Sequence, residues 1–74
     1  MATPVLAHIT GTVWKIEVEK GRTVAEGDVL VILESMKMEM PIEAPSSGVV
    51  IEILVREGQA VNEGATVLVM EVSA

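Results

Sequence analysis

Short runs of apolar residues, most of them valine, isoleucine and leucine, alternate along the whole chain with breaks marked by glycine. Branched side chains of this kind favour strands because they suit a pleated, packed surface. No stretch of adequate length carries the helical stripe with a period of about 3.6 residues. The pattern predicts strands at Val5–His8, Thr12–Val18, Asp28–Glu34, Met38–Ala44, Val49–Val55 and Thr66–Val72, with short extended pieces around Val24 and Val61.

The same pattern occurs twice. The segment from Pro4 to Glu34 matches the segment from Pro41 to Glu71 without a gap, and all six glycines pair under this shift. Two similar halves that each leave an apolar face uncovered can bury both faces by packing on each other. The sequence therefore predicts an all-β fold, a flattened barrel or sandwich of two four-stranded antiparallel sheets with internal pseudo-two-fold symmetry.

Several positions have specific expectations within this frame. Val13, Ile16 and Val18, with their partners in the second half, are the expected core. A break in strict alternation near Trp14 predicts a bulge or a local twist. The Trp14 side chain is expected to pack, and the alternative is an exposed side chain that contacts a partner. Pro41 lies inside a predicted strand, so that strand should be an edge strand or contain a bulge.

The repeat also predicts where the turns and the ends of the chain lie. Gly27 and Gly64 read as turn residues that supply a positive φ. Because the shift carries Lys37 onto Ala74, the turn around Lys37 and the two chain ends should lie at opposite poles. A protein or linker joined at one end would then leave the lysine pole free.

Composition limits what such a chain can do. Its 74 residues, numbered 1–74, are expected to form one domain. The formal charge is −6, with five basic residues among eleven acidic ones, so nucleic acid binding is not expected. The longest apolar run, Val29 to Leu33, is far too short to span a bilayer, and no signal peptide opens the chain. The absence of cysteine fits a reducing compartment, and we expect a cytoplasmic protein.

Candidates for catalysis are weak. His8 is the one histidine, and without cysteine it offers no metal cluster and no nucleophile pair, so it reads as a surface residue at a strand end. Glu17 and Glu19 read as a solvated face rather than a general acid and base. We therefore expect no catalytic residue, no metal and no enzyme activity in this chain itself.

One segment stands out against this background, because it places a lysine between two methionines at the joint of the repeat: Glu34-Ser35-Met36-Lys37-Met38-Glu39. Together with the later Glu43-Ala44-Pro45-Ser46-Ser47-Gly48, it resembles the attachment signature of biotinyl domains, the biotin carboxyl carriers of biotin-dependent carboxylases. The resemblance covers essentially the whole chain. It implies that Lys37 carries biotin as an amide, added by a biotin protein ligase.

The resemblance also implies partners and roles. The biotin would be carboxylated by a biotin carboxylase and would give up the carboxyl group at a carboxyltransferase. The lysine stem and the biotin side chain make a tether of roughly 14 Å. Met36 and Met38 would flank the site as soft apolar contacts for several partners, or one of them packs down on the barrel. Met40 is assigned to the core. Glu34 and Glu39 either help to exclude wrong partners or are plain surface charges.

Two other functions stay open at this point. The related lipoyl domains share the repeat and the fold, but they usually place aspartate before the lysine and alanine after it, whereas Lys37 has a methionine on each side. A third possibility is an unmodified β-barrel that mediates assembly, in which Lys37 is incidental. The chain lacks an Ala/Pro-rich linker, which fits either a small stand-alone carrier or a domain cut from a larger subunit. The carboxylase and the acceptor that it serves are not encoded in these residues.

Overall fold

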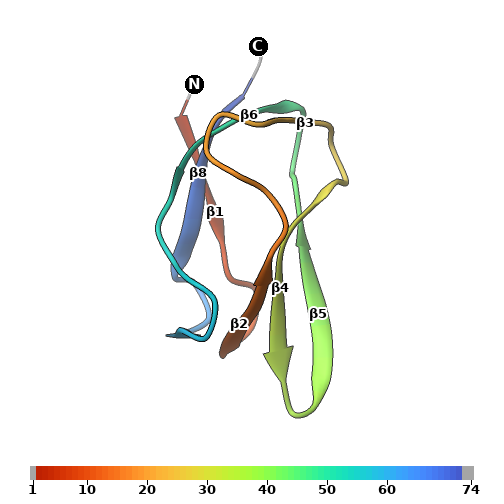
Figure 1. The fold of residues 1–74 in the computed structure, drawn as a ribbon, viewed down its shortest axis with the longest axis vertical. Helices are drawn as coiled ribbons and strands as arrows, with labels where there is room; N and C mark the ends of the chain where they lie inside the picture. The colour runs from red at the N-terminus through yellow and green to blue at the C-terminus, as the bar shows by residue number, and fades with distance from the viewer. Residues whose placement is uncertain (1, 73–74) are drawn as a thin grey trace.

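The computed structural model describes residues 2–72, and every regular element in that range is a strand (Figure 1). No helix in residues 2–72 is long and apolar enough to cross a membrane. The strands are β1 (Ala2–Leu6), β2 (Gly11–Ile16), β3 (Thr23–Val24), β4 (Val29–Ser35), β5 (Met38–Glu43), β6 (Gly48–Ile53), β7 (Ala60–Val61) and β8 (Thr66–Val72).

The strands form two four-stranded antiparallel sheets, as the sequence predicts. The order is β1-β8-β6-β3 in one sheet, here called sheet A, and β5-β4-β2-β7 in the other, called sheet B. The repeat shift turns one order into the other strand by strand. Each sheet takes two strands from each half of the sequence, so the halves interlock and neither half forms a sheet alone.

The predicted irregularities are confirmed. The register of β2 against β4 shifts between Val13 and Lys15, which makes Trp14 the bulged residue. The repeat partner, β6 against β8, shifts between Val50 and Glu52. Pro41 lies in β5, which is an edge strand of sheet B. An edge strand tolerates proline because it has only one neighbouring strand with which to form hydrogen bonds.

Some predicted strand boundaries are wrong by a few residues. The strand expected at Val5–His8 runs from Ala2 to Leu6, because Ala2 pairs with Glu71 at the far end of β8. The signal for this extension is weak in the sequence, because the added residues include Pro4, which has no backbone N–H to donate. The strand expected to reach Val18 ends at Ile16, although the Glu17 N–H still donates to the carbonyl of Leu30 in β4 at 2.9 Å and the Val18 side chain is buried.

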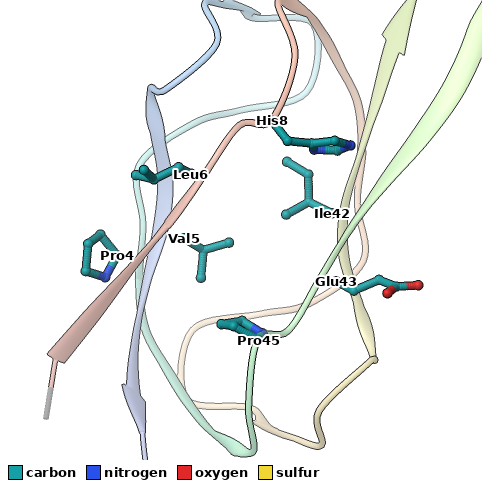
Figure 2. Close-up of a pocket in the computed structure, with 7 residues that line it drawn as sticks. All are labelled: Pro4, Val5, Leu6, His8, Ile42, Glu43 and Pro45. Carbon is teal, nitrogen blue, oxygen red and sulfur yellow. The ribbon is translucent and has the colours of Figure 1, made fainter.

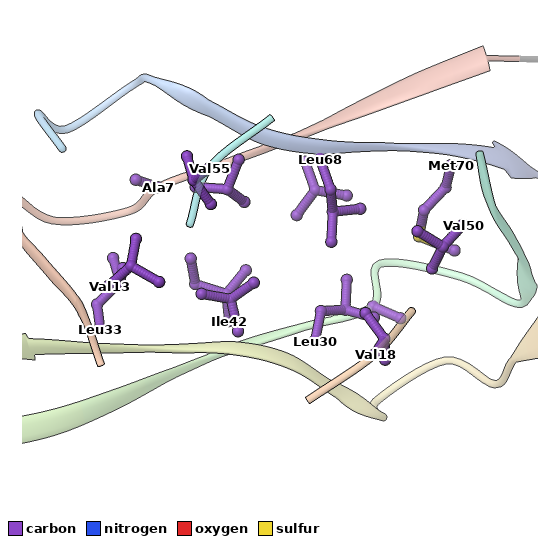
Figure 3. Close-up of a cluster of buried hydrophobic side chains, with 14 of the residues drawn as sticks. Ala7, Val13, Val18, Leu30, Leu33, Ile42, Val50, Val55, Leu68 and Met70 are labelled. Atoms are coloured by element: carbon purple, nitrogen blue, oxygen red, sulfur yellow. The ribbon is translucent and has the colours of Figure 1, made fainter. Parts of the chain in front are cut away.

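The space between the sheets is filled by apolar side chains from both (Figure 3). Among residues 2–72 no polar or charged side chain is buried, and no buried side-chain nitrogen or oxygen lacks a partner. The expected core residues Val13 and Val18 are buried, while Ile16 is half-buried and packs against the core. The buried set is Val5, Ala7, Val13, Val18, Val24, Leu30, Val31, Leu33, Ile42, Ala44, Val50, Val55, Val61, Val67, Leu68 and Met70.

Two glycine turns join the halves. Gly27 and Gly64 both have a φ of 89°, as the sequence predicts. The N–H of Gly27 donates to the carbonyl of Ala44 in the other half at 2.9 Å, and the N–H of Gly64 donates to the carbonyl of Ala7 at 2.8 Å. Each turn therefore contributes a hydrogen bond between halves that depends on a left-handed backbone.

This geometry predicts the effect of filling the turns. Replacing Gly27 or Gly64 with Val should lower the free energy of unfolding by about 1–2 kcal/mol or more, because a branched side chain is strained at positive φ. The matched variants Gly27→Asn and Gly64→Asn should lose less, since Asn tolerates the left-handed region. Urea denaturation measures both. Equal stability of the Val variants and the wild type would show that the turns do not hold the halves together.

Candidate functional site

Lys37 lies on the two-residue turn that joins β4 to β5 in sheet B. Ser35 at the end of β4 pairs with Met38 at the start of β5, so that only Met36 and Lys37 connect them. Their φ angles are 52° and 66°. Positive φ at both central residues is the signature of a type I′ turn, whose twist matches that of the flanking strands.

The turn is built from residues that do not favour it. Type I′ turns prefer Asn-Gly or Asp-Gly, because other side chains are strained in the left-handed region by roughly 1–2 kcal/mol per residue. Met36 and Lys37 are the two non-glycine residues with positive φ in the described part of the chain. The pairing of β4 with β5 therefore keeps Met36 and Lys37 in a turn conformation that these residue types do not favour. Strain of this kind is often found where a function requires particular side chains.

The side chains of the turn point into solvent. Met36 is 93% exposed and Met38 is 63% exposed, so the alternative in which one of them packs down on the barrel is wrong. Lys37 is exposed as well. Met40 is half-buried and does not belong to the buried core, so its assignment to the core is also wrong. Two apolar side chains kept in water beside a lysine contribute nothing to the core.

The hairpin behind the turn has an acidic surface. Glu34 and Glu39 face each other across the β4–β5 ladder, and both are exposed. Like charges directly opposite each other destabilise a strand pair. The two glutamates are thus a second feature of this hairpin that stability does not explain.

The position of the turn follows from the repeat. The shift places Met36 and Lys37 on Ser73 and Ala74, which lie outside the described residues. The start of β1 at Ala2 and the end of β8 at Val72 lie at one end of the long axis, and the turn lies at the other (Figure 1). The molecule measures 36 Å along this axis and 18 Å across it, so the lysine pole is far from both ends of the described chain.

A separate groove of about 390 Å³ lies where the edge strands β1 and β5 approach each other (Figure 2). Val5 and Ile42, which are repeat partners, point toward each other across it, and His8 lies at one end. His8 is exposed and follows β1, as expected for a strand-end surface residue. The groove contains none of the residues around Lys37. Among residues 2–72 no group of three or more His, Cys, Asp or Glu residues is placed to hold a metal.

Trp14 does not meet its expectation. Its side chain is 46% exposed on β2, so the packing expected from the sequence is wrong, while contact with a partner stays a prediction. The bulge explains the difference, because it places Trp14 opposite no single partner and leaves it on the outer surface of sheet B.

Comparison with known proteins agrees with this geometry. A family model described as "Biotin-requiring enzyme", the biotin/lipoyl family, matches residues 1–70. A biotinylated protein TB7.3 homolog from Mycobacterium leprae is 50% identical over 44 residues, which span 60% of this chain and 62% of that relative. The chain thus matches less than two thirds of the length of that relative.

Two solved structures match nearly the whole fold. A single-chain, multi-domain long-chain acyl-CoA carboxylase superposes with a TM-score of 0.93 and 32% identity, over 97% of this chain and 7% of that one. The urea carboxylase of Kluyveromyces lactis superposes with a TM-score of 0.91 and 37% identity, over 96% of this chain and 6% of that one. In both, the matching part is a small portion of a much longer carboxylase chain.

The strain in the turn predicts how replacing Met36 changes the free energy of unfolding. Met36→Asn should raise the free energy of unfolding by roughly 0.5 kcal/mol, because Asn tolerates a left-handed backbone and Met36 packs against nothing that the change would lose. Met38→Asn is the control and should bring no gain, since Met38 begins a strand. Thermal and urea unfolding report both values. A loss of about 1 kcal/mol or more in Met36→Asn would mean that the Met36 side chain supports the fold.

Proposed function

Because this chain belongs to the biotin/lipoyl attachment family, and to its biotin carboxyl carrier type, we propose that it carries biotin covalently on Lys37 and moves a carboxyl group between two enzyme active sites. One observation carries the proposal. Lys37 is an exposed primary amine on a two-residue turn, at the pole opposite the described ends of the chain.

The attachment chemistry fits this position. The Lys37 Nζ would attack the acyl carbon of biotinyl-AMP, forming an amide bond while the bond to the phosphate breaks and AMP leaves. The amine nitrogen loses a proton as the amide forms, so the biotin protein ligase must also accept a proton. For both the attack and the proton transfer, Lys37 must enter the active site of another protein. A hairpin tip can do so without unfolding, whereas a lysine in the middle of a sheet cannot.

The residues around Lys37 would orient the attached group. When bound, biotin supplies a ureido nitrogen that can accept a carboxyl group and release it. The lysine stem gives the group its reach, and the β4–β5 ladder gives the stem a fixed origin. Met36 and Met38 are flexible and polarisable, so they can form apolar contacts with differently shaped entrances.

We further propose that the domain itself catalyses nothing, and that its partners are a biotin protein ligase, a biotin carboxylase and a carboxyltransferase. In this division the cofactor supplies the chemistry and the carrier supplies position and recognition. The lipoyl alternative is less well supported, because Met36 and Met38 stand where lipoyl domains usually have aspartate and alanine. The relatives reported above also carry biotin or carboxylase names.

The first functional prediction concerns the attachment site. Co-expression with a biotin protein ligase should give a protein that binds streptavidin, and Lys37→Ala should abolish the signal. Lys37→Arg should abolish it too while leaving the melting temperature within error, because an exposed tip side chain makes few stabilising contacts. Lys20→Ala, in another exposed turn, is the matched control and should be biotinylated like the wild type. Streptavidin binding by Lys37→Ala would contradict the assignment.

The second functional prediction concerns transfer. With a cognate biotin carboxylase, ATP and labelled bicarbonate, the biotinylated protein should acquire an acid-labile label far faster than free biotin at equal concentration. The surface around the turn contributes binding energy to orientation, and free biotin lacks it. Met36→Ser/Met38→Ser, with biotinylation confirmed by mass, should lower labelling or onward transfer without changing the melting temperature.

The outcome that would overturn the carrier function is equally direct. If a confirmed cognate carboxylase labels the biotinylated protein no faster than free biotin, the domain contributes no recognition. The lipoyl and assembly functions would then have to be tested in its place.

A further inference from the structure

The methionines of this chain differ widely in how far they reach into solvent. Met70 is 0% exposed and belongs to the buried core, and Met40 is half-buried on β5. Met36 and Met38, in contrast, are 93% and 63% exposed. Solvent therefore reaches two thioether sulfurs, and both belong to the residues on either side of Lys37.

A thioether that is open to solvent can be oxidised by a peroxide. A lone pair of the sulfur attacks one oxygen of hydrogen peroxide, so that an S–O bond forms, the O–O bond breaks and the second oxygen leaves as water. The sulfur loses two electrons and the peroxide gains them. The product, methionine sulfoxide, is polar where methionine is apolar. Hydrogen peroxide is uncharged at neutral pH, so the exposed Glu34 and Glu39 on this hairpin do not repel it.

Oxidation at the turn leaves the packing of the fold intact. Neither Met36 nor Met38 belongs to the buried core or to the half-buried residues that pack against it, so an oxygen added to either sulfur lies in water. A sulfoxide at Met70 would instead bury a polar group among apolar side chains, which is unfavourable. Oxidation of the two exposed methionines therefore changes the surface that a partner meets, and not the core.

The same exposure allows the oxidation to be reversed. Methionine sulfoxide reductases, one for each sulfoxide epimer, convert the side chain back to the thioether. In this step a dithiol is oxidised to a disulfide, and the sulfoxide oxygen leaves as water. Met36 lies on the two-residue turn and Met38 directly follows it, so both can enter the active site of a reductase without unfolding. Met70 can be reached only when the core opens.

We propose that Met36 and Met38 form a reversible oxidation site that regulates how well the carrier is recognised. As thioethers they make apolar contacts with the enzymes that receive Lys37. As sulfoxides they must lose bound water at each such contact, which weakens it. The oxidant is a peroxide, and the reductant is the dithiol of a methionine sulfoxide reductase. This inference rests on the proposed function and adds to it a regulation of the same turn.

The first experiment follows the oxidation itself and needs no carboxylase. The full chain without biotin is treated with hydrogen peroxide, the peroxide is removed with catalase, and peptides are mapped by mass, which also separates Met1, outside the described residues. Met36 and Met38 should each gain one oxygen at least about tenfold faster than Met70, whose sulfur is reached when the core opens. The two reductases with a dithiol should restore the original mass, and the melting temperature should stay within error throughout.

The second experiment measures recognition of the biotinylated protein by a biotin carboxylase that accepts the wild type. After peroxide treatment and its removal, the KM of the wild type should rise at least about fivefold with kcat within about twofold, and the reductases should reverse the rise.

Two variants, each compared with its own untreated sample, locate the effect. Met36→Leu/Met38→Leu keeps two apolar side chains of similar volume but has no sulfur at the turn, so peroxide should change its KM by less than about twofold. Because biotin has a thioether of its own, this variant also reports what oxidation of the biotin does. Met40→Leu keeps both exposed sulfurs and should respond to peroxide like the wild type.

The outcomes separate this inference from the proposed function. If the carboxylase does not use the untreated wild type, the proposed function fails and the regulation fails with it. If the carboxylase uses the untreated wild type, but peroxide leaves its KM unchanged or affects Met36→Leu/Met38→Leu equally, the carrier function stands and the regulation is overturned. Oxidation of Met70 as fast as Met36, or sulfoxides that both reductases leave in place, would also overturn it.

Discussion

The interlocking of two repeated halves across one apolar core is the constraint on which the rest of the structure depends. Each sheet is completed by strands from both halves, so neither apolar face is buried until both halves are in place. Fully burying a valine or leucine side chain is worth roughly 1.5–3 kcal/mol, and the core consists almost entirely of such residues. The Gly27 and Gly64 turns add hydrogen bonds from each half to the other. A chain this short has little stability to spare, which makes cooperation between the halves essential.

The same symmetry accounts for the position of Lys37. A turn must join the end of the first half to the start of the second. This turn lies at the pole away from Ala2 and Val72. Stability would favour Asn-Gly in that turn, yet it holds Met36 and Lys37 with positive φ and exposed side chains. A strained turn, exposed methionines and facing glutamates have a common explanation if the tip is shaped for recognition by other proteins.

Much of this could be predicted from the sequence, because the repeat states the same pattern twice. The two four-stranded sheets, the bulge at Trp14, the edge position of Pro41 and the glycine turns all follow from periodicity and turn chemistry. Strand ends were less predictable, since pairing with a distant strand decides them, as at Ala2. The exposure of Trp14 was missed because a bulge removes the alternation that assigns a side chain to one face. The exposure of Leu6 (48%) and Leu54 (46%) was missed as well, although the repeat pairs them with the charged Glu43 and Glu17. Only the fold shows that these positions point outward.

The central claim is that Lys37 carries biotin, and the intact mass of the protein purified from its native host, followed by peptide mapping, tests it most directly. The account predicts a mass raised by one biotinyl group, located on the peptide that contains Lys37. A mass raised by a lipoyl group, an unmodified mass in cells that biotinylate their other carriers, or biotin on Lys15 or Lys20 would contradict it.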